Sequence, residues 1–151
     1  MLPFFIEELS LFDIDRVLKI IKQENKRFVE PIVTTISRER TPFHVLISCL
    51  LSLRTRDQTT REASNRLFAV ADNPEDIMKI PAERLEKLIY PVGFYRTKAR
   101  KIKEICDVLI QTYQGKVPDE IDELLKLNGV GRKTANLVVT LGYQKPGICV
   151  D

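Results

Sequence analysis

The stretch LNGVGRKTANLVV, Leu127–Val139, decides the fold. It predicts a short helix, a tight turn over Asn128–Arg132, and a second helix with a lysine in its first turn. Glycine takes backbone angles that cost other residues dearly, so Gly129 and Gly131 permit a turn that approaches a ligand closely. The amides that open the second helix lack partners within it and carry the positive end of the helix dipole, which suits a phosphate oxygen. Lys133 then places a primary amine beside that phosphate.

Two other motifs precede this hairpin in a fixed order. They are PFHVLISCLLSLRTRDQTT (Pro42–Thr60) and VGFYRTKARKI (Val92–Ile102). With the hairpin, Lys133 and the final ICVD, they resemble the endonuclease III family of DNA base-excision glycosylases across Leu11–Asp151. A single Gly-x-Gly turn would be weak, because such hairpins occur in many DNA-binding proteins. Three ordered motifs make the resemblance specific.

The overall composition is that of an ordinary soluble protein. The 151 residues can form one domain with a real core, and they are 44% hydrophobic and 30% charged. A net charge of +3 permits nucleic-acid binding without requiring it. No apolar run approaches the roughly 20 residues of a membrane span, and the start MLPFFIEELSLF has early acids instead of a basic region. We therefore expect an intracellular protein (in the cytoplasm and nucleoid, or in a nucleus) without a membrane partner.

The three cysteines, Cys49, Cys106 and Cys149, are odd in number and far apart, as expected of reduced thiols. Cys49 and Cys106 have apolar helical surroundings, which predicts that both are buried and structural. The resemblance implies a [4Fe–4S] cluster held by four cysteines beyond the point where this sequence stops. We expect these 151 residues to bind no metal or cofactor, and the gene product to continue past Asp151 with the cluster.

Apolar spacing and capping residues predict an all-α protein, since no window alternates like a strand. The resemblance implies a six-helix barrel-type domain over 27–142, with the helix–hairpin–helix at 119–142. An N-terminal segment, 1–26, would belong to a second, incomplete domain, and 143–151 would begin the C-terminal return. The expected helices are Asp13–Glu24, Pro42–Leu53, Asp57–Val70, a short one capped by Asn73, Ala82–Tyr90, Arg96 to just before Gly115, one from Pro118 into the hairpin, and Arg132–Leu141, with residues 27–40 as a connection.

The chain also contains a weak internal echo. LIYPVGFYRTKA (Leu88–Ala99) aligns with LLKLNGVGRKTA (Leu124–Ala135). Two explanations stay open: helix–turn–helix elements that pack alike, and an ancient duplication. The alignment pairs Gly93 with Gly129, Arg96 with Arg132, and Ala99 with Ala135.

The resemblance implies that the protein flips a damaged nucleotide out of the duplex, because the sugar carbon C1′ is shielded while its base stays stacked. The backbone would be gripped by the hairpin, whose carbonyls in related proteins also hold a monovalent cation against phosphate. The alternative is a merely structural helix corner. The residues assigned to this grip are Asn128, Gly129, Val130, Gly131 and Arg132.

The space that the flipped base leaves would be filled from two loops. Arg54 stands where several relatives carry glutamine, and Phe94 stands where they carry an apolar wedge. Arginine can hydrogen-bond an orphaned base, whereas phenylalanine can only stack or wedge. The alternatives are a solvated surface arginine and a phenylalanine packed in the core.

The chemistry would belong to Lys133 and Asp151. The amine of Lys133 would attack C1′ and form a Schiff base, and β-elimination would then cut the strand. Asp151 would stabilise positive charge on the sugar, and the return from Gly142, through Pro146-Gly147, is long enough to bring it near Lys133. His44 lies in an apolar helix, which favours a structural or surface role over catalysis.

The leading hypothesis is a monomeric hydrolase and lyase: a glycosylase with abasic-site lyase activity that removes oxidised pyrimidines from duplex DNA. We expect the 151-residue piece to be weakly active or inactive. One alternative is a mismatch-specific monofunctional glycosylase, which usually has serine or tyrosine in place of Lys133. Another is a non-catalytic helix–hairpin–helix module, which would leave the first two motifs unexplained. The preferred lesion stays open.

Overall fold

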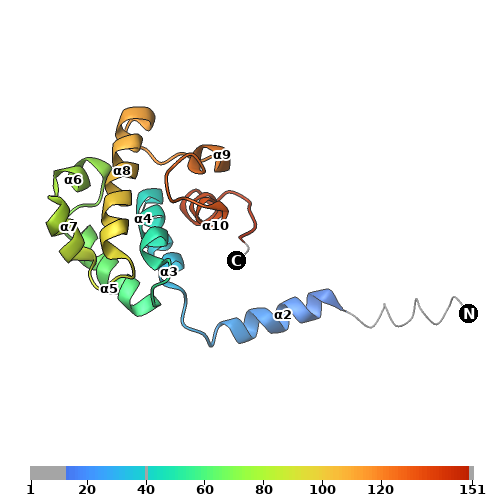
Figure 1. Cartoon of the computed structure of the whole chain (residues 1–151). Helices are drawn as coiled ribbons and strands as arrows, with labels where there is room; N and C mark the ends of the chain where they lie inside the picture. Colours follow the sequence, from blue (N-terminus) through green and yellow to red (C-terminus); the bar gives the residue numbers. More distant parts are fainter. Residues whose placement is uncertain (1–12, 40, 150–151) are drawn as a thin grey trace, which may run out of the picture. The chain divides into compact units, whose positions relative to one another are not determined.

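The structure is a computed structural model that describes residues 13–39 and 41–149, and this part of the chain contains helices and no strand (Figure 1). The predicted all-α fold class is therefore confirmed. No described helix is long and apolar enough to cross a membrane. In chain order the described helices are α2 (Ile14–Asn25), α3 (Ile32–Glu39), α4 (Pro42–Ser52), α5 (Asp57–Phe68), α6 (Pro74–Lys79), α7 (Ala82–Ile89), α8 (Tyr95–Tyr113), α9 (Ile121–Leu124), α10 (Arg132–Leu137) and the π-helix η1 (Val138–Gly142).

The chain divides into two compact units, Met1–Glu30 and Pro31–Asp151. The first contains α2, which the apolar stripe predicts correctly, and Asp13 caps it by accepting the N–H of Arg16 at 3.1 Å. None of the residues of α2 is buried, and Ile14, Leu18 and Ile21, which form the apolar stripe with Val17, are about half exposed.

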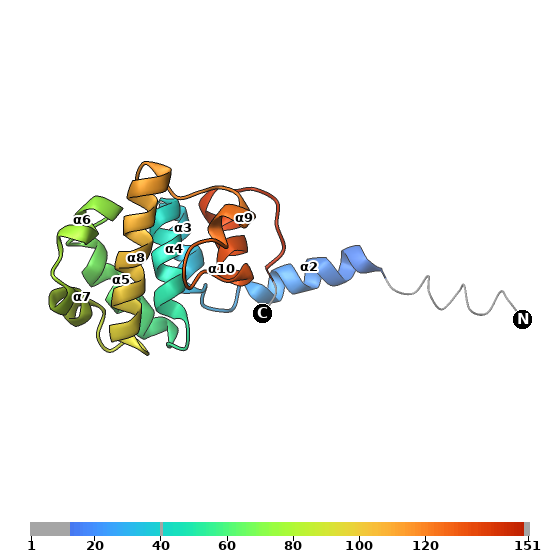
Figure 2. The ribbon, with the colours of Figure 1, turned by 45° about the horizontal axis from the view of Figure 1, so that its top comes forward.

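Helix α4 forms the centre of the second unit. Every residue from Phe43 to Leu51 is buried, because α4 packs against α3, α5, α8, α10 and η1. In both views, α6 and α7 lie on one side of the long helix α8, while α4 and then α10 lie on the other (Figures 1 and 2). Helix α8 therefore runs between the two halves of the unit, next to the central helix.

The prediction that residues 27–40 form a connection is wrong, because Ile32–Glu39 is helix α3. Ile32, Val33 and Ile36 lie on one helical face, and all three are buried. The N–H of Ile32 donates to a carboxylate oxygen of Asp57 at 3.1 Å, which supplies a partner at the start of the helix. Pro31 precedes the first helical residue, where proline does not interrupt hydrogen bonding.

The other predicted helices exist, with most ends shifted by one or two residues. Helix α8 ends before Gly115, as predicted, and the N–H of Gly115 donates to the carbonyl of Leu109 at 2.8 Å. The expected helix Arg132–Leu141 instead changes after Leu137 into η1. There the Thr140 hydroxyl donates to the Asn136 carbonyl at 2.7 Å, and such back-bonding competes with the regular helical ladder.

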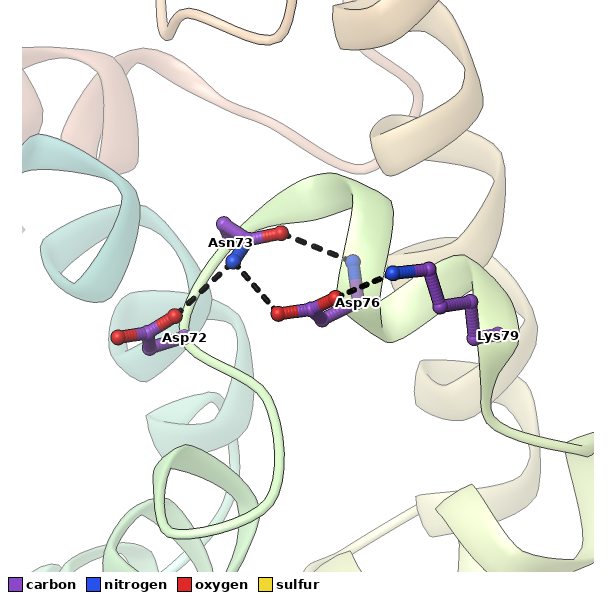
Figure 3. Close-up of polar contacts among 4 residues, drawn as sticks. All are labelled: Asp72, Asn73, Asp76 and Lys79. Carbon is purple, nitrogen blue, oxygen red and sulfur yellow. Dashed lines mark hydrogen bonds and ion pairs between the residues drawn. The ribbon is translucent and has the colours of Figure 1, made fainter.

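The predicted cap of the short helix α6 is also present (Figure 3). The side-chain oxygen of Asn73 accepts the backbone N–H of Asp76 at 2.8 Å, and its amide nitrogen donates to the carboxylates of Asp72 and Asp76. Lys79 donates to Asp76 at 2.7 Å, and this hydrogen bond lowers the pKa of that carboxyl group. A six-residue helix is thus anchored at its first turn by side chains.

Candidate functional site

The hairpin turn is anchored by two buried side chains and shaped by one glycine. Leu127 and Val130 are 2% and 6% exposed, and the N–H of Val130 donates to the Leu127 carbonyl at 3.1 Å. Gly129 has φ +89°, a left-handed conformation that favours glycine. Gly131 has φ −96°, which any residue adopts, so only Gly129 uses the backbone freedom that both glycines permit. Because the side chain of Val130 is buried, only its backbone is available to a ligand.

The surface of the turn is open at Gly131 and supported by α8 at its other end. A methyl group at Gly131 would meet no atom within 4 Å, whereas one at Gly129 would lie 3.1 Å from the side chain of Lys101. The amide of Asn128 donates to the carboxylate of Glu104 at 2.8 Å. Packing within the protein therefore does not require glycine at position 131, and this position leaves room for an incoming molecule.

Lys133 lies in the first turn of α10 with an exposed side chain. The next two residues, Thr134 and Ala135, are buried and attach this turn to the core. The side-chain amide of Asn136 donates to the carbonyl of Arg132 at 2.9 Å. The helix thus presents Lys133 outward directly after the open glycine.

The chain after η1 folds back toward Lys133. Tyr143 donates its hydroxyl hydrogen to the Val117 carbonyl, and the ammonium of Lys145 lies 2.8 Å from the carboxylate of Asp119. The thiol of Cys149 then reaches to 3.8 Å from the Lys133 carbonyl oxygen. The predicted return is present as far as Cys149. Asp151, the predicted carboxylate, lies outside the described residues.

Cys49 and Cys106 are buried, as predicted, whereas Cys149 is exposed. Burial raises the pKa of the Cys49 thiol to about 12, and nearby Cys149 raises it further while Lys133 opposes the shift. Burial also raises the pKa of Cys106 to about 12. An iron–sulfur cluster is usually held by four cysteine thiolates, and this chain has three cysteines, two of them buried. The described residues contain no cluster of three or more side chains suited to a metal ion.

Arg54 and Phe94 come from different loops and meet. Both have left-handed backbones, with φ values of 52° and 56°, and both are exposed, Phe94 at 63%. The Arg54 guanidinium carbon lies 5.8 Å from the centre of the Phe94 ring, within the range of a cation–π contact. This placement excludes core packing for Phe94.

The pair borders a pocket of about 440 Å³ that reaches the hairpin at Gly129. The structure thereby brings three predicted elements together: the Arg54 loop, the Phe94 loop and the turn. Sequence analysis missed Lys98, although a lysine on the buried face of a helix that also holds Ala99 and Ile102 is a readable signal. The pocket is lined by Leu50, Leu53, Arg54, Phe94, Thr97, Lys98, Lys101 and Gly129.

His44 has the structural surroundings that its sequence context favours. It is 7% exposed, its Nδ1 accepts the backbone N–H of Thr41 at 3.2 Å, and its ring lies edge-on to Phe68 with centroids 4.4 Å apart. His44 therefore contributes to the N-terminal cap of α4.

Comparison with known proteins identifies relatives that match most of the chain. The sequence model described as "HhH-GPD superfamily base excision DNA repair protein" matches residues 47–151. Endonuclease III of Thermotoga maritima is 51% identical over 114 residues, which are 76% of this chain and 54% of that protein. Endonuclease III of Bacillus subtilis is 40% identical over 73% of this chain and 50% of its own length. The chain therefore spans about half the length of these curated relatives.

Solved structures of DNA glycosylases and of endonuclease III–DNA complexes also match the chain. A non-covalent endonuclease III–DNA complex matches with a TM-score of 0.77 and 37% identity, over 93% of this chain and 65% of that one. A trapped covalent endonuclease III–DNA intermediate matches with a TM-score of 0.75 and 36% identity over the same shares. A thermostable thymine-DNA glycosylase matches with a TM-score of 0.71 and 28% identity, over 80% of this chain and 60% of that one.

Proposed function

Because the chain belongs to the HhH-GPD superfamily of base excision DNA repair proteins, we propose that it carries the DNA-gripping and nucleophilic part of a glycosylase with abasic-site lyase activity. The family predicted from the three motifs is confirmed. The observation that carries the proposal is the position of Lys133, which is exposed in the first turn of α10, directly after a hairpin turn that shares a pocket with Arg54 and Phe94.

The nucleophile in this proposal is the Lys133 amine. A free amine attacks C1′ of the flipped nucleotide, and the bond from C1′ to the base breaks as the base leaves with its electron pair. One nitrogen proton balances the charge of the departing base and another passes to the ring oxygen O4′ as the C1′–O4′ bond breaks, which leaves a Schiff base between the lysine nitrogen and C1′. Removal of a proton from C2′ then expels the 3′ phosphate by β-elimination. Exposure of Lys133 makes the amine accessible to a sugar that has left the duplex.

The hairpin supplies the grip on the DNA backbone. Its open surface at Gly131 admits a phosphate to the backbone amides of the turn, and Lys101 beside Gly129 adds positive charge. The Arg54–Phe94 pair fills the space left by the flipped base, with the ring as wedge and the guanidinium as hydrogen-bond donor. We propose duplex DNA with an oxidised pyrimidine or an abasic site as the substrate.

The test is borohydride trapping. The chain is incubated with a duplex that contains one abasic site, and borohydride reduces any Schiff base to a stable adduct. We expect a slowly formed adduct with the native chain and with Lys126→Gln, which removes an exposed lysine that does not line the pocket. Lys133→Gln should lower the trapping rate by roughly 10³-fold or more while duplex affinity stays nearly unchanged.

Two results would contradict this function. Continued trapping by Lys133→Gln would place the nucleophile on another residue. Release of an oxidised pyrimidine from a second duplex that carries this damaged base, without any adduct, would instead indicate a monofunctional glycosylase that uses water.

A further inference from the structure

The loop that carries Arg54 and the loop that carries Phe94 touch each other through backbone atoms. A methyl group on Gly93 would lie 2.7 Å from the carbonyl oxygen of Arg54 and 3.3 Å from the Thr55 hydroxyl. Real side-chain carbons do not approach so closely, so the contact requires glycine. The loops are therefore packed together at the base of the exposed Arg54–Phe94 pair.

Lys98 lies beneath this contact. It belongs to the first turns of α8 and is 8% exposed. Its ammonium donates to the carbonyls of Leu51 at 3.0 Å and Leu53 at 2.5 Å, and to the Thr55 hydroxyl at 3.2 Å. An ammonium has three hydrogens, so these three acceptors use all of them. Each acceptor lies at the end of α4 or in the loop that follows.

The Thr55 hydroxyl extends this set of bonds to the second loop. It accepts the N–H of Gly93 at 3.0 Å, accepts from Lys98, and donates to the Leu53 carbonyl at 3.2 Å. The hydroxyl has one hydrogen and two acceptor positions, and all are used. Lys98 and Thr55 thus join the end of α4, the Arg54 loop and the Phe94 loop.

We propose that Lys98 is a positioning residue that, through Thr55, holds the Arg54 and Phe94 loops as one preformed unit before DNA arrives. Left-handed conformations at Arg54 and Phe94 cost free energy, and the surrounding bonds must maintain them. A unit that is already ordered loses less conformational entropy when it enters the base stack. The role rests on the proposed function, since it concerns how the pair reaches DNA.

The geometry also separates Lys98 from Lys133. The ammonium of Lys98 is enclosed by its three acceptors, whereas the side chain of Lys133 is exposed. Burial lowers the pKa of Lys98 to about 8. A lone pair would form only by giving up one of the three bonds, so the group supports the loops and does not attack the sugar.

The test compares Lys98→Met with Lys103→Met. Lys103 lies on the same helix and donates to a backbone carbonyl, that of Met78, at 3.3 Å, but it does not border the pocket of the Arg54–Phe94 pair. Thr55→Val removes the shared hydroxyl with little change in volume, and Thr55→Ser retains it. These variants separate loss of the loop bonds from a general loss of stability.

The first readout needs no DNA. Amide hydrogen exchange of Gly93 should become roughly fivefold faster in Lys98→Met and Thr55→Val, because a weakened hydrogen bond exposes that N–H. Lys103→Met and Thr55→Ser should exchange at the native rate. Native exchange in both Lys98→Met and Thr55→Val would overturn the proposal, whether or not the protein acts on DNA.

The second readout uses duplexes with 2-aminopurine, a fluorescent base, next to a tetrahydrofuran abasic analogue. Lys98→Met should reduce the fluorescence rise at saturating protein and slow borohydride trapping on a true abasic site by about tenfold. Its duplex affinity should stay within about threefold, because the hairpin is untouched. Faster Gly93 exchange with unchanged fluorescence and trapping would also overturn the positioning role. Failure of the native chain to trap would instead contradict the proposed function.

Discussion

The molecule contains two helix corners with similar sequences and different surfaces. One joins α7 to α8 within Leu88–Ala99, and the other joins α9 to α10 within Leu124–Ala135. Both end on a buried alanine, Ala99 or Ala135, which packs the second helix against the core. Similar packing of the second helix therefore accounts for the similar sequences of the two corners. It does not decide between convergence and duplication.

The corners differ in which residue has the left-handed backbone. In the α9–α10 corner it is Gly129, so the turn presents backbone and an open position at Gly131. In the α7–α8 corner it is Phe94, one position later in the alignment, so the turn presents an exposed ring. One corner is suited to docking a phosphate, and the other to inserting a side chain between bases.

Each corner also contains a lysine, and the two lysines are offset by one position in the alignment. Lys98 aligns with Thr134, and Lys133 aligns with Thr97. One residue corresponds to about 100° around a helix, so Lys98 and Thr134 are buried while Lys133 and Thr97 are exposed. The same residue type thus supports loops in one corner and presents a nucleophile in the other.

The largest expected effect comes from putting a lysine at the inward position of the α9–α10 corner. Thr134→Lys puts an ammonium at a position that is only 4% exposed, in place of a much smaller hydroxyl side chain. We expect the free energy of unfolding to fall by about 3 kcal/mol or more. Denaturant titration measures the change.

The matched control is Thr97→Lys, which puts a lysine at the outward position of the other corner. Thr97 is exposed, so its replacement should change stability by less than about 0.5 kcal/mol. Equal losses in Thr97→Lys and Thr134→Lys would mean that the inward and outward positions are not distinct.

A smaller effect is expected from adding one methyl group to a glycine in each corner. Gly93→Ala forces a carbon against the Arg54 carbonyl, which lies only 2.7 Å away, and should cost about 2 kcal/mol of stability. Gly131→Ala meets open space with an ordinary φ and should cost less than about 0.5 kcal/mol. Thermal unfolding of both variants measures these losses of stability. A large loss of stability in Gly131→Ala would show that the fold requires glycine at this position.

Local sequence signals predicted most of the fold. Asn73 and Gly115 mark a helix start and a helix end in the sequence, and both function so in the structure. Helix α3 was missed because Pro31 and the charged SRER sequence outweighed the spacing of Ile32 and Ile36, whose burial depends on α4 and η1. Tertiary packing therefore determined the helical structure of that segment.

Sequence alone could propose candidate site residues but not the contacts between them. Sequence alone pointed to the exposure of Phe94 and to the close approach at the hairpin. It could not show that Arg54 contacts Phe94, or that Lys98 and Thr55 hold their loops, since these contacts join residues about 40 positions apart. Such pairings depend on how α4 and α8 pack.

The smallest expected effect concerns the open position of the hairpin. Gly131→Val places a branched side chain where a phosphate is proposed to approach, and its Cβ would meet no protein atom within 4 Å. Duplex affinity should fall by roughly tenfold, which corresponds to about 1.4 kcal/mol. Because phosphate contacts carry no base information, the loss should be the same for damaged and undamaged duplexes. Fluorescence anisotropy with matched duplexes measures both affinities, with Gly131→Ala as the milder variant. A loss confined to damaged DNA would mean that the α9–α10 corner contacts the lesion and not only the phosphate backbone.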